Sequence, residues 1–268
     1  MSAMQADLRG LSVAVTGGTK GIGRAAVTTL SANGAHVVFQ GTDETAGQEI
    51  EALCAQGPGK AVFVRGDLLR FEDACELVSA GRARCGRLDV YVSSGGPRDP
   101  RPVLFREMTG PEDSIALLQS RLLPRLNALH AAVPVMREQG GGKIILLTTD
   151  AARTPTPSES MVGAAGAAVI ALTRSLAKEL VRDGIRINAI ATTITSGTPP
   201  YDAYLAAKAE RRADTLVKAF SKAHEQVGLR INTAQDLADY ILFLASPASD
   251  QITGSTMSIN GGLSFPSY

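Results

Sequence analysis

Residues 11–24 read Leu-Ser-Val-Ala-Val-Thr-Gly-Gly-Thr-Lys-Gly-Ile-Gly-Arg. The apolar run 11–15 predicts a buried strand, and glycines 17, 21 and 23 follow it directly. Because glycine has no Cβ, this spacing allows a tight turn that brings bare backbone amides close to a pyrophosphate. A helix beginning near Gly21 would direct its first amides and its positive dipole end at the same phosphates. The stretch therefore predicts a strand, a dinucleotide-binding loop and a helix at the head of an α/β chain.

Similar apolar runs recur along the chain, with helical segments between them. The expected strands are 11–15, 36–39, 61–64, 88–92, 144–147, 185–190 and 256–259. Most of these runs are continuous rather than alternating, as in parallel strands that helices cover on both faces. We therefore expect a single domain over residues 1–268, with a Rossmann-type doubly wound parallel sheet of about seven strands and helices on both faces.

The stretch from about 192 to 233 interrupts this alternation. It opens with Thr192-Thr-Ile-Thr-Ser-Gly-Thr-Pro-Pro200 and continues into a polar helical segment, 201–226. A long excursion after the sixth strand lies at the edge of the sheet where substrates bind, which favours a helical lid. A solvated helical decoration is the alternative.

Composition limits the partners. The net charge is +1, and no basic run is longer than Arg211-Arg212, so a nucleic-acid footprint is not expected. The three cysteines are widely spaced without a CxxC pair, which argues against a disulfide framework or a metal site. The N-terminus has no apolar signal region, and no uninterrupted apolar run approaches the ~20 residues of a membrane span. These features predict a cytoplasmic protein with no membrane partner.

The motifs resemble the short-chain dehydrogenase/reductase family, particularly a divergent 3-oxoacyl-carrier-protein reductase-like branch. The resemblance runs nearly end to end, through the glycine loop, Asp67, the 184–190 strand and the 252–262 closing strand and turn. It implies a nicotinamide dinucleotide cofactor, a small-molecule substrate, and a homodimer or homotetramer formed by helices near 111–139 and 158–182. The implied cofactor-binding residues are Gly17, Thr19, Lys20, Gly21, Ile22, Gly23, Thr42, Asp67, Leu68, Ser94 and Gly95.

Two positions bear on the choice of cofactor. By the resemblance, an NAD-type member carries an Asp at the end of its second strand, where this chain has Gly41, followed by Thr42 and Asp43. Lys20 stands where NADP-binding members often place a cation. A cation favours the 2′-phosphate, so NADP(H) is expected over NAD(H), although Asp43 argues the other way.

The resemblance also exposes a degenerate active site. The family's catalytic Tyr and Lys fall at Val162 and Gly166, its Ser at Thr149 and its Asn at Arg121. No Tyr lies between Tyr91 and Tyr201, and no Lys lies between Lys143 and Lys178, so an error in alignment cannot restore the pair. Other sequence motifs of the family differ too. Ser94-Gly-Gly-Pro97 follows the fourth strand, and Thr192-Thr193 follows the sixth.

Few residues could replace the missing pair. Thr149, Asp150 and Arg121 are the catalytic candidates, with a turn residue as the alternative for Asp150 and a structural ion pair for Arg121. Packing is the favoured role for Tyr201 and Tyr204, and His224 is expected to be solvated. His130 is expected in the core or an interface, and Glu159 and Ser160 as helix-capping residues.

Three functions remain open. The first is an atypical oxidoreductase that acts on a small carbonyl or hydroxyl compound through a non-standard proton donor. The second is a nucleotide-binding pseudoenzyme, and the third is a non-redox isomerase or lyase that uses Asp150 or Thr149. Fold alone does not choose among them.

Overall fold

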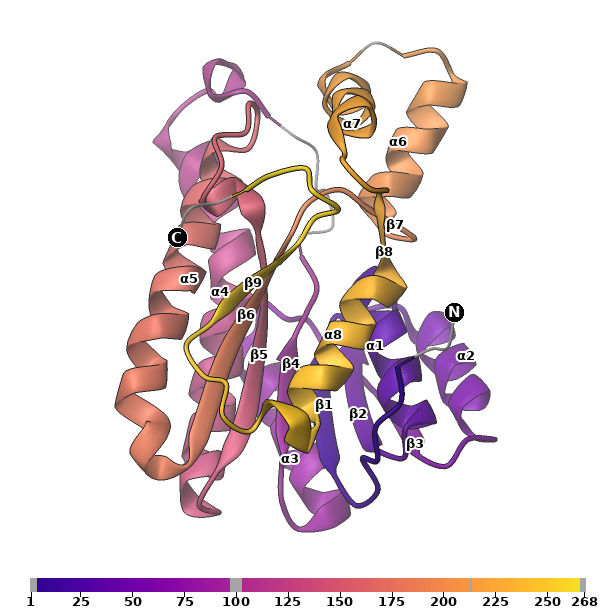
Figure 1. The fold of residues 1–268 in the computed structure, drawn as a ribbon, viewed down its shortest axis with the longest axis vertical. Helices are drawn as coiled ribbons and strands as arrows, with labels where there is room; N and C mark the ends of the chain where they lie inside the picture. The colour runs from indigo at the N-terminus through magenta and orange to yellow at the C-terminus, as the bar shows by residue number, and fades with distance from the viewer. Residues whose placement is uncertain (1–3, 97–102, 213, 266–268) are drawn as a thin grey trace.

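The computed structural model describes residues 4–96, 103–212 and 214–265. Its main sheet has seven parallel strands in the order β3-β2-β1-β4-β5-β6-β9 (Figure 1). The strands are β1 (Ser12–Thr16), β2 (His36–Gly41), β3 (Lys60–Arg65), β4 (Val90–Ser93), β5 (Gly142–Thr149), β6 (Ile185–Thr192) and β9 (Thr256–Ile259). Every expected strand is present, and the predicted doubly wound sheet is confirmed.

Helices cover both faces of this sheet, which explains why the strands are apolar throughout. All residues of β1 and of β4 are buried. One face packs against α1 (Gly21–Ala32), α2 (Glu44–Cys54) and α8 (Ala234–Ala245). The other packs against α3 (Phe71–Cys85), α4 (Pro111–Glu138) and α5 (Ser160–Leu180). The sheet is therefore the middle layer of three.

The excursion after β6 contains two helices instead of the one expected. It holds β7 (Thr195–Ser196), α6 (Pro199–Ala209), α7 (Thr215–Gln226) and β8 (Asn232–Thr233), and β7 pairs with β8 in a small parallel sheet. The two helices stand beyond the end of the main sheet (Figure 1). The Asp214 side chain accepts a hydrogen bond from the Val217 amide and so starts α7. Because this cap starts a new helix, the segment forms two helices, α6 and α7, rather than one.

Aromatic residues hold α6 and α7 together. The rings of Tyr204 and Phe220 lie 5.2 Å apart, and the exposed His224 stacks on Tyr204. Tyr204 is 1% exposed. The expected packing role of Tyr204 is therefore confirmed. By contrast, His130 is exposed beside the Phe71 ring, so it does not lie in the core, and its place in an interface stays a prediction.

In the part of the chain that the structure describes, one helical stretch, Ser160–Asp183, passes the length and composition test for a membrane span, with a mean hydropathy of 1.4. It consists of α5 and the short turn that follows it, and α5 packs on β5, β6 and α4. Because core helices pass the same test, its composition alone does not indicate a span.

Candidate functional site

The glycine loop lies at the switch point of the sheet, where β1 has β2 on one side and β4 on the other. A Cβ added at Gly17 would lie 2.5 Å from the Gly95 Cα, and the two residues have φ of +64° and +88°. The Thr16 hydroxyl donates to the Ser94 carbonyl at 3.0 Å, which ties the two loops together. The structure thus brings the predicted Gly17, Ser94 and Gly95 into one place, whereas Pro97 lies outside the described residues.

Helix α1 begins inside this loop with its first amides uncapped. Lys20 is the N-cap residue, but no side chain forms a cap hydrogen bond there, and the first turn has no acidic residue. A Cβ added at Gly23 would lie 2.0 Å from the Gly17 carbonyl oxygen, so the helix packs directly on the loop. Bare amides and a positive helix end suit a diphosphate, so the loop fits the cofactor that the sequence predicts.

A cavity of about 500 Å³ adjoins the loop at the ends of β2 and β3. Its lining comprises Thr42, Arg65, Gly66, Asp67, Arg70 and Asp73. The Asp67 amide donates to the Asp73 carboxylate at 2.7 Å, and the Asp67 carboxylate accepts from the Leu69 amide. The predicted Thr42 and Asp67 therefore line one cavity that carries two arginines.

Gly41 has a steric reason to be glycine. A Cβ there would lie 2.6 Å from both Cγ2 and Oγ1 of the buried Thr19, so no aspartate fits at this position unless Thr19 moves. Nearby, the Lys20 ammonium lies 2.9 Å from the Asp43 carboxylate. The Lys20 ammonium and the cap bond to the Ala46 amide lower the pKa of Asp43. Lys20 and Asp43, the two residues that argue for opposite cofactors, are thus paired with each other.

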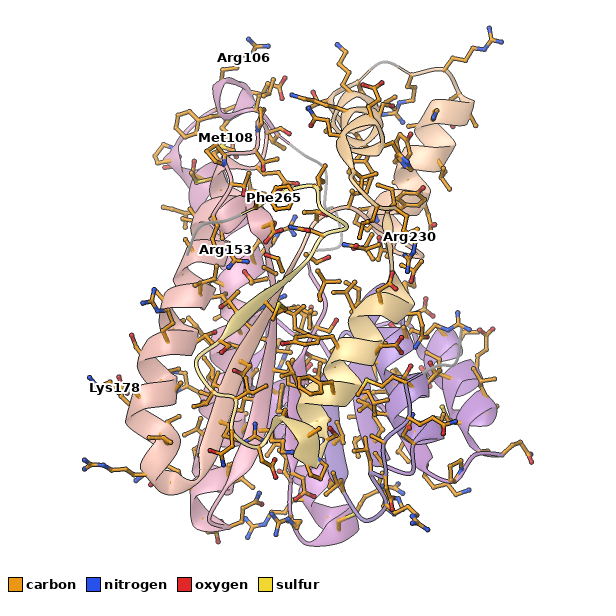
Figure 2. All side chains as sticks on the ribbon, viewed as in Figure 1. Arg106, Met108, Arg153, Lys178, Arg230 and Phe265 are labelled. Atoms are coloured by element: carbon orange, nitrogen blue, oxygen red, sulfur yellow. The ribbon has the colours of Figure 1, made fainter. Side chains whose placement is uncertain are left out.

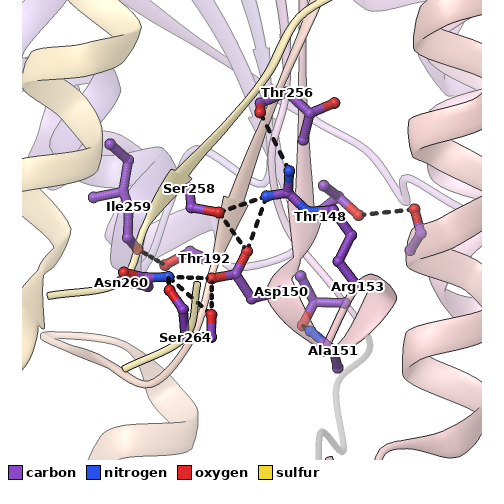
Figure 3. Close-up of polar contacts among 12 residues, drawn as sticks. Thr148, Asp150, Ala151, Arg153, Thr192, Thr256, Ser258, Ile259, Asn260 and Ser264 are labelled. Carbon is purple, nitrogen blue, oxygen red and sulfur yellow. Dashed lines mark hydrogen bonds and ion pairs between the residues drawn. The ribbon is translucent and has the colours of Figure 1, made fainter. Parts of the chain in front are cut away.

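The Asp150 carboxylate is bound to the C-terminal segment of the chain (Figure 3). It is 1% exposed and accepts hydrogen bonds from Arg153, Ser258, Asn260 and Ser264 at 2.6–3.1 Å. Because these donors occupy both carboxylate oxygens, the arrangement fastens the segment after β9 to the end of β5. The hypothesis that Asp150 takes the place of the missing proton donor is not supported by this geometry.

The other β5 candidate, Thr149, lies beside the positions of the missing pair. Its hydroxyl accepts from the Ala151 amide at 3.1 Å. A Cβ added at Gly166 would lie 2.7 Å from the Thr149 Cγ2 and 3.0 Å from the Ala152 Cβ. Threonine and alanine side chains therefore fill the space that a residue larger than glycine would need at the family's lysine position.

Neither Lys143 nor Lys178 takes the place of the missing lysine. The Lys143 ammonium donates to the carbonyls of Ala245 and Ser246 and pairs with Asp250 at 3.0 Å. Lys178 points away from the sheet (Figure 2). A Tyr–Lys pair with the family spacing does exist, since the Lys208 ammonium donates to the Tyr204 hydroxyl at 3.1 Å. It belongs to α6, however, and Tyr204 packs against α7 rather than at the end of β5.

Reinstating the pair by mutation should therefore fail. We expect the double variant Val162→Tyr, Gly166→Lys to lose about 1–3 kcal/mol of stability, because the new side chain at 166 overpacks the contact with Thr149. It should gain no ketoreductase activity in an NADPH assay with β-keto substrates. The single variant Val162→Tyr is the control for packing at 162. Wild-type stability together with new turnover in the double variant would contradict this prediction.

Two arginines on α4 approach the same end of the sheet. Arg125 is fully buried and donates to the carbonyls of Leu147 and Gly95 at 2.9–3.0 Å. Arg121 lies one turn earlier on the same helix face, and its Nη1 lies 3.9 Å from the Cβ position of Gly96. Burial, together with the nearby Arg121, lowers the pKa of Arg125 to about 10. The expected structural ion pair at Arg121 was wrong, because none within 4.0 Å is found among the described residues.

Glu159 is the N-cap residue of α5, as its position predicts, but its side chain forms no cap hydrogen bond. Burial raises the pKa of Glu159, although the charge of Arg121 opposes this shift. Arg125 and Glu159 are thus the site residues that the sequence missed. The spacing of Arg125, four residues after Arg121, was the one available signal.

A doubly wound sheet with a glycine loop at its switch point defines a Rossmann-type protein, and comparison identifies the family. Residues 17–264 match the family described as enoyl-(acyl carrier protein) reductase. The chain is 30% identical to the 3-oxoacyl-[acyl-carrier-protein] reductase FabG of Escherichia coli, over 96% of this chain and 98% of that one. It is 32% identical to the probable galactose dehydrogenase GalD of Rhizobium meliloti, over 96% of each chain. The chain therefore belongs to the short-chain dehydrogenase/reductase family, as its motifs indicate.

A solved structure agrees on the fold. The 7α-hydroxysteroid dehydrogenase complexed with NADH and 7-oxo glycochenodeoxycholic acid matches with a TM-score of 0.83, over 96% of this chain and 95% of that one. The sequence identity is 24%, so this likeness bears on the fold alone. An uncharacterized oxidoreductase of Thermotoga maritima, 30% identical over 96% of this chain and 98% of its own length, is another full-length relative.

Proposed function

We propose that this protein is an atypical oxidoreductase that binds NADP(H) and acts on a small carbonyl or hydroxyl compound without the usual Tyr–Lys pair. The observation that carries the proposal is the uncapped start of α1, which packs on a loop of bare backbone at the switch point. A bound nicotinamide would supply or accept the hydride. The residues proposed to hold the cofactor are Gly17, Thr19, Lys20, Gly21, Ile22, Gly23, Thr42, Asp67, Leu68, Ser94 and Gly95.

Lys20 and Gly41 support NADP(H) over NAD(H). The crowding by Thr19 at Gly41 leaves no room for the carboxylate that would bind the ribose hydroxyls, and Lys20 offers a cation for the 2′-phosphate. Arg65 and Arg70 line the neighbouring cavity, but Asp67 and Asp73 line it too and Asp73 pairs with Arg70 at 3.4 Å, so this cavity adds no argument for either cofactor. Asp43 opposes this preference only in part, because its carboxylate is already engaged by Lys20 and the Ala46 amide.

Direct titration tests the cofactor. We expect NADPH to bind at least about 10-fold more tightly than NADH, a difference of about 1.4 kcal/mol. The variant Lys20→Met should remove most of that difference while leaving NADH affinity unchanged, as measured by calorimetry. Lys178→Met, on the outer side of α5, is the matched control. Absence of binding by both coenzymes at millimolar concentration would refute the proposed function.

A pseudoenzyme is the second candidate, and the closed lysine position favours it. Single-turnover oxidation of bound NADPH by a panel of β-keto and quinone-like compounds separates it from an enzyme. Binding without any oxidation would favour the pseudoenzyme. The isomerase or lyase hypothesis loses its best base, because Asp150 is committed to four side-chain donors.

The 192–233 segment is proposed to act as a lid. The start of α6 already touches the phosphate loop, since the Thr198 methyl lies 3.3 Å from the Cβ position of Gly21. Movement of α6 would therefore change access to the loop directly.

We expect a homodimer or homotetramer formed through α4 and α5. Ala164, Ala167 and Ala171 are exposed along one stripe of α5, and such small residues permit close helix approach. The variant Ala167→Glu should reduce the mass measured by size-exclusion light scattering to that of the monomer, 28.0 kDa. Ala206→Glu, on an exposed position of α6, is the control. A wild-type monomer would contradict this prediction.

A further inference from the structure

Arg121 is a partly buried cation, and among the described residues no ion pair neutralises its charge. Its Nε atom is inaccessible and makes no hydrogen bond, and no side-chain hydrogen bond of Arg121 is found among the described residues. Burial lowers the pKa of Arg121, although the charge of Glu159 opposes this shift. Taking a guanidinium out of water without a partner is unfavourable, so such a group is retained where it has another use.

The neighbouring charges do not balance Arg121. Arg125, one turn further along α4, directs its N–H groups at backbone carbonyls and adds a second positive charge. Among the described residues, Glu159 is the carboxylate whose charge acts on Arg121. The two side chains do not form an ion pair within 4.0 Å. Burial raises the pKa of Glu159, and this single carboxylate faces two cations, Arg121 and Arg125.

Geometry places this charge beside the loop that follows β4. The Nη1 of Arg121 is close to Gly96. The preceding residue, Gly95, contacts the glycine loop at Gly17. Arg125 links the end of β5 to the loop after β4 through Leu147 and Gly95. Thr149 comes two residues after Leu147. Val162, at the position of the family's catalytic Tyr, lies one turn after Glu159 on α5. The cation therefore borders the place where a substrate carbonyl would lie.

From these contacts we infer that Arg121 binds the carboxylate of an oxo-acid or hydroxy-acid substrate. The guanidinium is planar and can hold a carboxylate through two parallel hydrogen bonds, which would both neutralise the charge of Arg121 and orient the carbonyl. Binding energy at the carboxylate would position the substrate in a site without a tyrosine. This inference rests on the proposed function, because it names the class of substrate for the same cleft.

The test compares acids with their own esters. Acetoacetate, 2-oxobutanoate and levulinate, each beside its methyl ester, are titrated by calorimetry into the full chain, free and saturated with NADP⁺, so that no turnover occurs. We expect at least one acid to bind 10-fold or more tightly than its ester. Arg121→Met should abolish this difference without changing NADP⁺ affinity, and Arg121→Lys should retain part of it because the charge remains.

Two controls make the result decisive. Arg137→Met removes an exposed arginine from the same helix and should leave every titration unchanged. Arg121→Met should melt at or above the wild-type temperature, because it removes a partly buried charge that no ion pair neutralises. If acids and esters bind alike, or if Arg121→Met loses NADP⁺ and acids together, the inference is overturned. Failure of NADP⁺ binding in the wild type refutes the proposed function instead, and the titrations of the free chain then decide the role of Arg121.

Discussion

Replacing Gly23 by alanine should lower NADPH affinity by at least about 100-fold, or about 2.8 kcal/mol. The added Cβ would lie 2.0 Å from the Gly17 carbonyl oxygen, so helix α1 and the loop must move apart. Both elements supply the amides that are proposed to hold the diphosphate, and their separation removes the converging hydrogen bonds. Fluorescence titration with NADPH measures the loss.

Folding must be measured in the same samples, since the forced separation should also cost about 1–3 kcal/mol of stability. Gly57→Ala is the matched control, because its Cβ would meet only the Cys54 carbonyl at an ordinary 3.5 Å. If a folded Gly23→Ala variant binds NADPH as the wild type does, then the coenzyme does not lie on this loop.

The fold could be predicted because its signals are local. Each strand is a short apolar run, and the expected 256–259 strand coincides with β9. The glycine loop is local too, and its strand–turn–helix context was visible in the sequence. The two-residue strands β7 and β8 were missed because two residues cannot display a periodic pattern.

The deeper part of the site could not be predicted, because it depends on contacts between distant residues. The Asp150 partners Ser258, Asn260 and Ser264 lie 108 to 114 residues away in the chain. The pKa of Arg121 likewise depends on its surroundings and on Glu159, 38 residues later by their numbering. The sequence showed at which positions this chain differs from the family. It did not show which hydrogen-bond partners the side chains at those positions have in the fold.

The variant Asp150→Ala tests whether Asp150 has a structural role or a catalytic one. We expect Asp150→Ala to lose about 3–5 kcal/mol of unfolding free energy, because Arg153, 8% exposed in its side chain, would lose its buried ion pair with Asp150. Ser258, Asn260 and Ser264 would lose an acceptor at the same time, which frees the segment after β9. At this chain length the loss corresponds to a fall of about 6–20 °C in Tm.

Urea and thermal unfolding measure the effect, with Glu138→Ala as the control. Glu138 pairs with Arg82 at 2.7 Å on the surface, so its loss should cost no more than about 1 kcal/mol. Asp150→Asn keeps the size of the side chain and one acceptor oxygen, and its stability should therefore fall between those of the alanine variant and the wild type. A catalytic Asp150 would give the opposite pattern: turnover lost in Asp150→Asn at wild-type stability. Because four side chains donate hydrogen bonds to its two oxygens, we expect the stability to fall.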